Sequence, residues 1–260
     1  MKIAFFDSGL GGLSVLHHAM KRLPDKQFVF FADEDNVPYG TKPPAEILRL
    51  VDDAFSFLTS QKVQAIVVAC NTATSVAVTA MRKKYPLPII GMEPSVKPAL
   101  AINPHRRVLV VATPVTVNGE KLKRLLDTLN ATQRVDALAL PKLVDFAEKS
   151  EFGVPAVEQF LREKLANFDL PSYSALVLGC THFNYFKDSF RRLLPTSVRI
   201  IDGNEGAVNE LIRRLPPDNS STSSPPTAEY FYSKRAVTDA AELRRLEQYL
   251  KRLDDMYRIQ

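Results

Sequence analysis

The stretch AIVVACNT occupies residues 65–72, where four apolar residues lead into a small residue, a cysteine, an asparagine and a threonine. A second stretch, ALVLGCTH at residues 175–182, has the same order, with a hydroxyl directly after the cysteine. Short, continuously apolar runs of this kind are typical of β-strands that are buried on both faces, as in parallel sheets. The two stretches therefore predict equivalent strands, each of which leads to a cysteine.

Five further short apolar runs lie along the chain, at residues 3–6, 28–32, 87–90, 108–112 and 198–201. Segments with helical spacing separate them; in residues 48–58 the apolar side chains recur largely at three- and four-residue steps. Strands that alternate with helices predict an α/β fold with mostly parallel sheets. Since ligands bind beyond the carboxyl ends of the strands in such sheets, we expect both cysteines to lie at a binding site.

The likeness between the two cysteine strands extends to the runs that precede them. The runs at 3–6 and 108–112 each end in polar residues, and each stands at a distance before one cysteine strand. This weak internal repeat predicts two pseudo-symmetric α/β domains with the active site in the cleft between them. We expect a first domain of residues 1–97 joined by the returning tail 207–260, and a second domain of residues 98–206.

The tail contains two recognisable segments. Residues 216–227 are rich in proline and serine, which predicts an exposed connection. Residues 240–259 predict a helix that packs an apolar stripe on the first domain and closes it. The expected stripe consists of Leu243, Leu246, Leu250, Leu253 and Tyr257.

The composition excludes several classes of protein. Hydrophobic residues make up 45% and charged residues 24% of the 260 positions, as in ordinary globular domains. Two cysteines are too few for a disulfide framework or a four-cysteine zinc site. The 34 basic residues exceed the 29 acidic ones only mildly and are scattered, so we expect no nucleic-acid partner. No segment approaches a signal-peptide core or a membrane span, which predicts a cytoplasmic protein without a membrane partner.

The two cysteines suit acid–base chemistry at a carbon atom. If they faced each other across a cleft, one thiolate could take a proton from one face of the carbon while the other thiol protonated the opposite face. The free thiol pKa of about 8.5 makes both protonation states accessible near neutral pH. Two alternatives stay open: His182 could pair with Cys180 in a single-thiol nucleophilic enzyme, or Cys70, Cys180 and His182 could bind zinc. No short metal-binding spacing supports the zinc site, so we expect no metal.

Two loops also follow predicted strands. The first, DSGLGG at residues 7–12, contains three glycines that allow the backbone to approach a ligand closely, next to amide groups at a helix start. Asp7 would repel a phosphate but would suit the ammonium group of a zwitterion; in the alternative, Asp7 only caps the helix. The second loop contains Pro38, Tyr39 and Gly40, and its proline and glycine hold Tyr39 at one position.

Taken together, these motifs resemble the signature blocks of the bacterial glutamate racemase family, within the aspartate/glutamate racemase superfamily. The resemblance rests on DSGLGG at 7–12, PYG at 38–40, CNTAT at 70–74 and GCTH at 179–182, and it extends over residues 3–215. It implies an interconversion of L- and D-glutamate that needs no cofactor and supplies D-glutamate for peptidoglycan. A superfamily member that acts on aspartate or another acidic amino acid is the alternative.

The resemblance also implies residue roles. Cys70 and Cys180 would be the two acid/base groups, with Cys70 acting on D-glutamate and Cys180 on L-glutamate. Asp7, Glu148 and His182 match residues that assist the thiols. The positions that match substrate-binding residues are Asp7, Ser8, Tyr39, Gly40, Asn71, Thr72, Thr113, Thr116, Thr181 and His182.

The chain departs from the family pattern at several places. Ala112 replaces a glycine before Thr113, Leu140 stands where many members carry a cysteine outside the catalytic pair, and residues 92–94 form a variant loop. No N-terminal extension of the kind that binds a cell-wall precursor in some members is present, so we expect no activator of that type. The tail aligns poorly with the family, which leaves a homodimer open.

Overall fold

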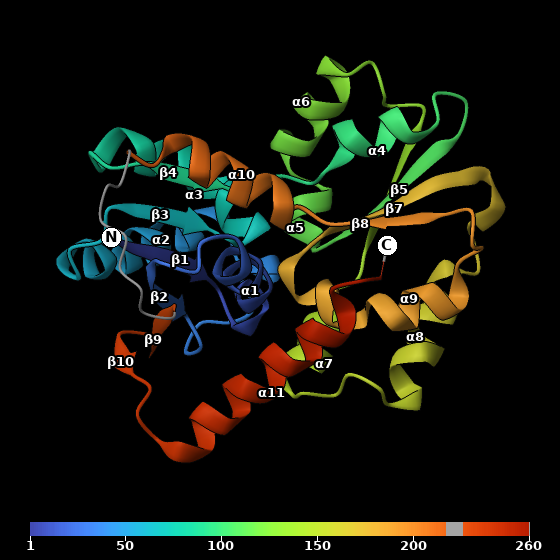
Figure 1. The fold of residues 1–260 in the computed structure, drawn as a ribbon. Coiled ribbons are helices and arrows are strands. Elements are labelled where there is room, and N and C mark those ends of the chain that lie inside the picture. Colours follow the sequence, from blue (N-terminus) through green and yellow to red (C-terminus); the bar gives the residue numbers. More distant parts are fainter. Residues whose placement is uncertain (217–225, 260) are drawn as a thin grey trace.

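Strand β1 (Lys2–Asp7) lies inside the first of two β-sheets in the computed structural model, which describes residues 1–216 and 226–259 (Figure 1). Within these ranges the first sheet contains six strands in the order β10-β9-β2-β1-β3-β4. All neighbouring strands are parallel except β9 and β10. The other strands are β2 (Gln27–Ala32), β3 (Ala65–Val68), β4 (Ile89–Gly91), β9 (Thr227–Tyr232) and β10 (Arg235–Ala236).

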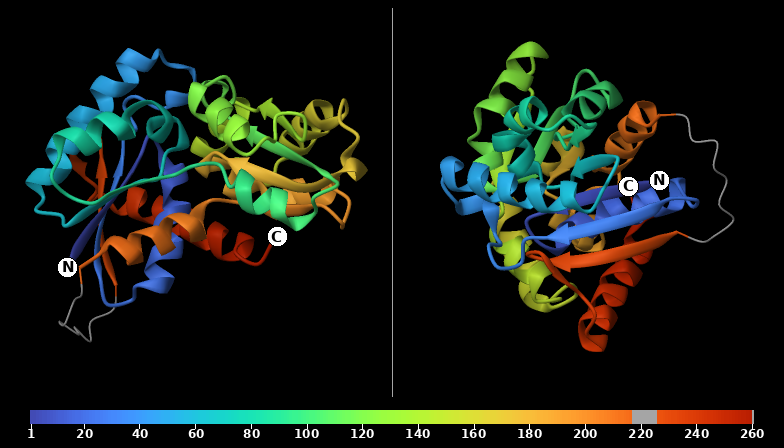
Figure 2. Two further views of the ribbon diagram at one scale, coloured as in Figure 1. Left: turned by 90° about the horizontal axis from the view of Figure 1, so that it is seen from above. Right: turned by 90° about the vertical axis from the view of Figure 1, so that its left-hand side faces the viewer.

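The second sheet of the described residues contains four parallel strands in the order β6-β5-β7-β8. These strands are β5 (Arg107–Ala112), β6 (Val135–Ala139), β7 (Tyr173–Gly179) and β8 (Arg199–Ile201). Figures 1 and 2 show the two sheets in separate lobes that lie side by side. β1 and β5 occupy comparable inner positions in the two sheets, and each lies beside the strand that leads to a cysteine.

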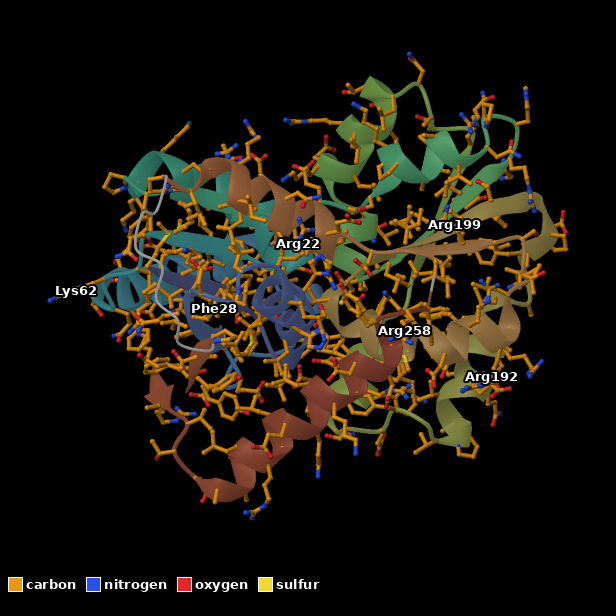
Figure 3. All side chains as sticks on the ribbon, in the orientation of Figure 1. Arg22, Phe28, Lys62, Arg192, Arg199 and Arg258 are labelled. Carbon is orange, nitrogen blue, oxygen red and sulfur yellow. The ribbon has the colours of Figure 1, made fainter. Side chains whose placement is uncertain are left out.

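Helices connect the strands and cover the sheets. The α-helices are α1 (Leu13–Arg22), α2 (Pro44–Ser60), α3 (Asn71–Lys84), α4 (Val96–Ile102), α5 (Pro114–Val117), α6 (Glu120–Thr128), α7 (Lys142–Glu148), α8 (Pro155–Leu165), α9 (Lys187–Leu193), α10 (Asn204–Arg214) and α11 (Ala240–Met256). Short 3₁₀ helices are η1 (Leu10–Gly12), η2 (Tyr39–Thr41), η3 (Leu170–Ser172) and η4 (Thr181–Phe186). Every helix of the described residues is too short or too polar to cross a membrane. Basic side chains such as Lys62 and Arg192 are exposed at opposite ends of the molecule (Figure 3).

Alternate residues of β1 are buried on opposite faces of the first sheet. Ile3 and Phe5 belong to the apolar cluster that includes α1, whereas Ala4 and Phe6 belong to a second cluster that includes α2 and α3. Successive side chains of a strand point to opposite faces, so a strand covered on both sides must be apolar at every position. This double burial explains why the run at residues 3–6 does not alternate.

The predicted α/β class with mostly parallel sheets is confirmed, and each of the predicted apolar runs forms a strand. The sequence pattern missed β6, β9 and β10. β6 is an edge strand whose residues are mostly half-buried, so it lacks a continuous apolar run. β9 is a strand because it pairs with β2 along its whole length, a contact between residues about 200 positions apart that local pattern does not contain.

The C-terminal helix α11 packs against α1 of the first lobe and against η4 of the second (Figures 1 and 2). Its buried residues are Leu246, Tyr249, Leu253 and Met256. The predicted stripe is wrong at Leu243 and Tyr257, which are 37% and 44% exposed. The buried face of α11 differs from the predicted one because the helix contacts both α1 and η4, and not a single sheet face.

The tail returns to the first sheet through β9 and β10. Residues 217–225 of the predicted proline- and serine-rich connection lie outside the described residues. We keep the division into domains at residues 97 and 207 as a proposal.

Candidate active site

Each cysteine lies just after an inner strand of its sheet. Cys70 stands between β3 and α3, and Cys180 stands between β7 and η4. Both are free thiols, and they are 5% and 6% exposed. They line one small pocket together with Ser8, Pro38, Tyr39, Gly40, Asn71, Thr72, Thr113, Val144, Thr181 and His182. The structure thus brings the two predicted acid/base residues together from different sheets.

The pocket between the thiols has a volume of about 10 Å³. This is close to the space of a single water molecule, roughly 10–15 Å³ on this measure. The site in this structure is therefore too narrow for an amino acid. An amino acid can enter only if the lobes or the surrounding loops move apart.

Cys70 lies in a buried position with two hydrogen bonds. Its Sγ atom accepts a hydrogen bond from the amide of Ala73 at 3.3 Å, and its thiol donates to Oγ of Ser8 at 3.6 Å. Burial raises the pKa of the Cys70 thiol to about 12, and the nearby Asp7 carboxylate adds to this effect. The closed pocket consequently favours the protonated thiol of Cys70.

Cys180 has a different partner. Its Sγ atom lies 3.8 Å from Nδ1 of His182, and Nε2 of the same imidazole contacts Oε1 of Glu148. Burial lowers the pKa of His182, but the hydrogen bonds to Cys180 and Glu148 outweigh it and hold that pKa well above its ordinary value. Burial likewise raises the pKa of Glu148, but the contact with His182 reverses this effect and holds it below its ordinary value. The two groups therefore form a buried imidazolium–carboxylate pair beside Cys180.

Asp7 ends β1 and connects the two lobes. Its Oδ1 accepts hydrogen bonds from the amide of Gly9 at 3.1 Å and from the Ser8 hydroxyl at 3.3 Å, and its Oδ2 accepts one from the Thr181 hydroxyl at 3.0 Å. Burial raises the pKa of Asp7 to about 6, against the opposing effect of the His182 charge. Asp7 does not cap helix α1, because the residue before that helix is Gly12 and no side chain caps it.

The three glycines of the first loop are needed for close packing against the site residues themselves. A Cβ atom on Gly9 would lie 2.2 Å from Oε1 of Glu148, and one on Gly11 would lie 2.4 Å from Nδ1 of His182. One on Gly12 would lie 2.4 Å from Cβ of Asp7. The sequence predicted a close approach to a ligand; in the structure the loop also approaches the thiol-assisting residues of the other lobe.

Tyr39 is held by Asp33, a residue that the sequence analysis missed. The Tyr39 hydroxyl donates a hydrogen bond of 2.6 Å to Oδ2 of Asp33, whose Oδ1 accepts from Ser233 of the C-terminal tail at 2.7 Å. Asp33 directly follows β2 and is therefore a polar residue at the end of a strand, the kind of position at which the sequence pattern identified other site residues. The strand-end rule could therefore have found Asp33.

Three threonines form a chain of hydroxyl groups across the junction between the lobes. Thr72 Oγ1 and Thr113 Oγ1 are 2.9 Å apart, and Thr113 donates a hydrogen bond of 3.2 Å to Thr116. Thr72 and Thr113 line the thiol pocket, whereas Thr116 lies behind Thr113. Thr116 thus orients Thr113 and does not reach the pocket.

Most of the predicted site residues converge. Among them, Asp7, Thr116 and Glu148 do not line the pocket but contact residues that do. The pocket also contains Pro38 and Val144, which the sequence analysis did not assign to the site. Val144 belongs to α7, the helix that carries Glu148, and only the packing of α7 against η4 brings it there.

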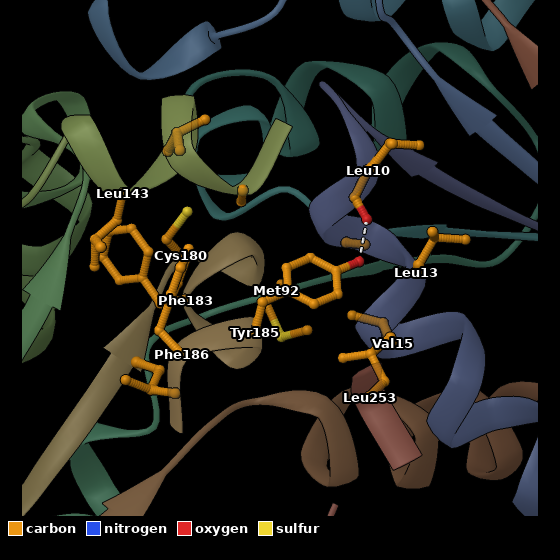
Figure 4. Packing of buried hydrophobic residues seen from close by; sticks show 14 of the residues in the cluster. Leu10, Leu13, Val15, Met92, Leu143, Cys180, Phe183, Tyr185, Phe186 and Leu253 are labelled. Carbon is orange, nitrogen blue, oxygen red and sulfur yellow. Dashed lines mark hydrogen bonds between the residues drawn. The ribbon is translucent and has the colours of Figure 1, made fainter. Parts of the chain in front are cut away.

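The apolar side of the site is formed by η4 and its neighbours. Figure 4 shows Cys180 beside Phe183 and Leu143, with Tyr185 reaching across to the glycine loop. The Tyr185 hydroxyl donates a hydrogen bond of 2.7 Å to the carbonyl oxygen of Leu10. This buried contact attaches the segment that carries Cys180 to the first lobe.

The arrangement of potential ligand side chains bears on the zinc alternative. Over residues 1–216 and 226–259, no cluster of three or more His, Cys, Asp or Glu side chains has a metal-binding arrangement. The His182 ring instead contacts Cys180 and Glu148. In this structure Cys70 bonds to Ser8, Cys180 bonds to His182, and His182 bonds to Glu148.

A larger cavity, of about 450 Å³, lies away from the thiols. Residues of α1, α4, α10 and α11 line it, including Arg22, and Asp202 after β8 lines it as well. Volume alone therefore does not identify the reaction site. The small pocket is the better candidate because thiols, an imidazolium and carboxylates converge there.

Comparisons with known proteins identify the family. The model of the Asp/Glu/hydantoin racemase family matches residues 13–211. The chain is 52% identical to the glutamate racemase of Campylobacter curvus, over 100% of both chains. It is 40% identical to glutamate racemase 2 of Bacillus subtilis, over 99% of this chain and 98% of the relative.

Solved structures agree with this result. The glutamate racemase of Campylobacter jejuni superimposes with a TM-score of 0.81 at 25% identity, covering 96% of this chain and 98% of that one. The Escherichia coli glutamate racemase, solved with L-glutamate and the activator UDP-MurNAc-ala, gives 0.81 at 27% identity, over 95% and 94% of the two chains. The chain therefore belongs to the Asp/Glu/hydantoin racemase family, and within it to the glutamate racemases.

Proposed function

We propose that the chain interconverts L- and D-glutamate by proton transfer between the α-carbon and two thiols, without a cofactor. The observation that carries this proposal is the pair of free thiols, Cys70 and Cys180, which line one closed pocket from two different sheets. Interconverting mirror images requires removing a proton from one face of the carbon and adding one to the other face, and one thiol on each face performs these two steps. The product would supply the D-glutamate of peptidoglycan.

The polar groups of the pocket suit a zwitterion with a second carboxylate. Hydroxyl and amide side chains of Ser8, Asn71 and Thr72 come from the first lobe, and those of Thr113 and Thr181 come from the second. These groups can donate hydrogen bonds to the carboxylates, while Asp7 can attract the ammonium group. Both lobes thus contribute to binding, which couples glutamate entry to closure of the site.

On the Cys70 side, a chain of hydrogen bonds leads away from the thiol. The thiol donates to Ser8, and Ser8 donates to Oδ1 of Asp7. As the substrate ammonium enters, its positive charge favours the thiolate, and the thiol proton can pass through Ser8 to Asp7. The Cys70 thiolate then takes the α-proton of D-glutamate while the Cys180 thiol delivers a proton to the opposite face.

In the reverse direction, Cys180 is the base. The His182 imidazolium beside its sulfur offsets the negative charge that the thiolate carries, and Glu148 holds the imidazolium in place. Cys180 takes the α-proton of L-glutamate, and the Cys70 thiol protonates the other face. The carbanion is stabilised electrostatically in a pocket from which water is excluded.

The decisive experiment follows each pure enantiomer in D₂O by chiral chromatography with mass spectrometry. With two bases, the first product formed carries solvent deuterium, whereas the remaining starting enantiomer keeps its protium. Deuterium that appears in the starting enantiomer as fast as in the product would contradict the two-thiol mechanism. D- and L-aspartate, assayed in parallel, test the alternative substrate.

We also propose that the protein acts in the cytoplasm, as a monomer or a homodimer. Sedimentation equilibrium with and without glutamate distinguishes the two assemblies. Fractionation of the producing cells tests the location.

A further inference from the structure

Glu34 is a buried carboxyl group next to the site that no step of the proposed reaction uses. It follows β2 and Asp33, and its side chain is only 17% exposed. Its Oε2 lies 3.9 Å from Nη1 of Arg245 on α11, and Nη2 of the same guanidinium donates a hydrogen bond of 2.8 Å to the backbone oxygen of Glu148, the last residue of α7. Three segments that are far apart in the sequence thus meet at this carboxyl group.

The two carboxyl groups leave complementary atoms unpaired. Oε1 of Glu34 and Oε2 of Glu148 are both buried, and neither finds a hydrogen-bond donor in the described part of the chain. An ionised carboxylate can only accept hydrogen bonds, so two carboxyl groups can bond to each other only when one of them holds a proton. One shared proton supplies the donor that these oxygens lack.

The surroundings decide which group holds the proton. Glu148 is kept ionised by the His182 imidazolium and by the amide of Leu10, which donates to its Oε1 at 2.9 Å. Burial and the charge of Glu148 raise the pKa of Glu34 to about 8, although Arg245 opposes them. Glu34 is therefore the acid and Glu148 the carboxylate of the pair.

Other titratable groups face this pair from the elements packed around it. They are Asp7 of β1, His182 and Tyr185 of η4, Tyr232 of β9, and Glu242, Arg245 and Tyr249 of α11. The tyrosines remain neutral where Glu34 titrates, because burial raises the pKa of each. Within this cluster, burial and the charge of Glu148 raise the pKa of Glu34 to about 8, so that its charge changes near that pH.

We propose that Glu34 is a positioning residue: as the protonated member of a carboxylic acid–carboxylate pair with Glu148, it sets the strength of the Glu148–His182 ion pair and thereby the pH dependence of proton transfer at Cys180. This inference rests on the proposed function of Cys180. When Glu34 ionises, its negative charge repels the Glu148 carboxylate and attracts the same His182 imidazolium. Cys70, which faces Asp7 and Ser8, has no contact with this pair.

Two variants distinguish the effect of the Glu34 charge from the effect of its hydrogen-bond donor. Glu34→Gln keeps the size and can still donate a hydrogen bond to Oε2 of Glu148, but it cannot ionise. Glu34→Leu removes the donor as well. Asp35→Asn is the matched control, because Asp35 is an acid on the same loop whose carboxylate instead pairs with Arg235 at the surface.

The first measurement does not depend on activity. Carbon-13 NMR of protein labelled at the glutamate carboxyl carbons should show one group that titrates near pH 8 in the unaltered protein and in Asp35→Asn. That titration should be missing in Glu34→Gln. If no glutamate titrates in this range, or if the signal persists in Glu34→Gln, the pair does not exist.

The second measurement is the pH profile of kcat/KM for racemisation. The unaltered protein should show an ionisation near pH 8 that Glu34→Gln lacks while it remains active. Glu34→Leu, which leaves Oε2 of Glu148 without a donor, should lose activity roughly tenfold, as expected for an unsatisfied buried acceptor. Identical profiles for the unaltered protein and Glu34→Gln would overturn the inference. A protein that does not racemise glutamate would instead refute the proposed function, and the NMR titration would still test the pair.

Discussion

The Sγ atom of Cys180 lies 3.8 Å from Nδ1 of His182, an imidazole that is itself paired with a buried carboxylate. Cys70, by contrast, contacts Ser8 and an amide group and lies in the field of Asp7. The two thiols therefore occupy one pocket in opposite electrostatic surroundings. This asymmetry determines what each substitution should do.

Replacing either thiol by a hydroxyl should abolish racemisation. Cys70→Ser and Cys180→Ser each remove one of the two groups that exchange a proton with the α-carbon, so we expect kcat below the detection limit of a polarimetric assay. One-way elimination from a glutamate analogue with a leaving group needs only one base. It should survive with one enantiomer of the analogue in each variant, and the two variants should prefer opposite enantiomers. Ordinary two-way racemisation by either variant would exclude the two-thiol mechanism.

His182→Asn should weaken proton transfer at Cys180 more than at Cys70. Because the enantiomers have equal free energies, kcat/KM must stay equal in the two directions, so rates alone cannot reveal the difference. Primary isotope effects can, if D- and L-glutamate deuterated at the α-carbon are compared. We expect the effect for L-glutamate, whose proton goes to Cys180, to rise while the effect for D-glutamate falls. Equal changes in both directions would contradict the pairing of His182 with Cys180.

Gly11→Ala should inactivate the protein without unfolding it. The new Cβ would lie 2.4 Å from Nδ1 of His182 and 2.5 Å from Oγ1 of Thr181, so the imidazole must move away from Cys180. The control is Gly206→Ala in α10, where nothing lies within 4 Å of the added atom. That control should keep full activity and gain up to about 1 kcal/mol in the free energy of unfolding, because alanine favours a helix over glycine. Normal activity in Gly11→Ala would show that the loop does not fix His182.

Asp7→Asn should raise the free energy of unfolding and lower the racemase activity above pH 6. The folded protein raises the pKa of Asp7 from 3.8 to about 6, so between these values the folded state binds a proton that the unfolded state has released. The free energy of unfolding therefore falls as the pH rises through this window, and the cost is complete above it. Asparagine removes this cost, so the variant should be more stable by about 1–3 kcal/mol at pH 8 and equal to the unaltered protein below pH 4.

Urea unfolding at pH 3.5 and pH 8 measures this difference in the free energy of unfolding. A racemase assay of Asp7→Asn at pH 8 should show a large loss of activity, because the asparagine cannot accept the proton relayed from Cys70. Equal stabilities at the two pH values would mean that Asp7 is not held at a raised pKa.

Glutamate should change the separation of the lobes. A pocket of about 10 Å³ between the thiols is too small for an amino acid, so the site must open to admit it and close again for chemistry. Small-angle scattering and hydrogen exchange should differ with and without glutamate. The exchange should change most in η2 and η4, which line the pocket, and in η1, which packs against η4. Unchanged scattering together with unchanged exchange in these segments would reject the opening.

The local pattern of the sequence determined seven of the ten strands of the described residues and the positions of the reactive groups. A strand buried on both faces must be apolar throughout, and the residue after it is fixed at the carboxyl edge of the sheet. The positions of Cys70, Cys180, Asp7 and Thr113 follow from this rule alone. The resemblance to glutamate racemases supplied Glu148, because its segment shows no such pattern.

The tertiary structure alone decided which groups meet. Arg245 contacts both Glu34 and Glu148, Asp33 contacts Ser233, and α11 packs on both lobes through a face that the helical pattern did not identify. Each of these contacts joins residues that are far apart in the sequence. The contacts of Arg245 and α11 with both lobes form only when the two sheets come together, whereas the Asp33–Ser233 bond forms when the tail adds β9 to the first sheet. The sequence thus established that two thiols stand at equivalent strand ends. Their burial and their different partners, which set the protonation state of the site, depend on how the lobes pack, because electrostatic interactions depend on distance and on exclusion of water.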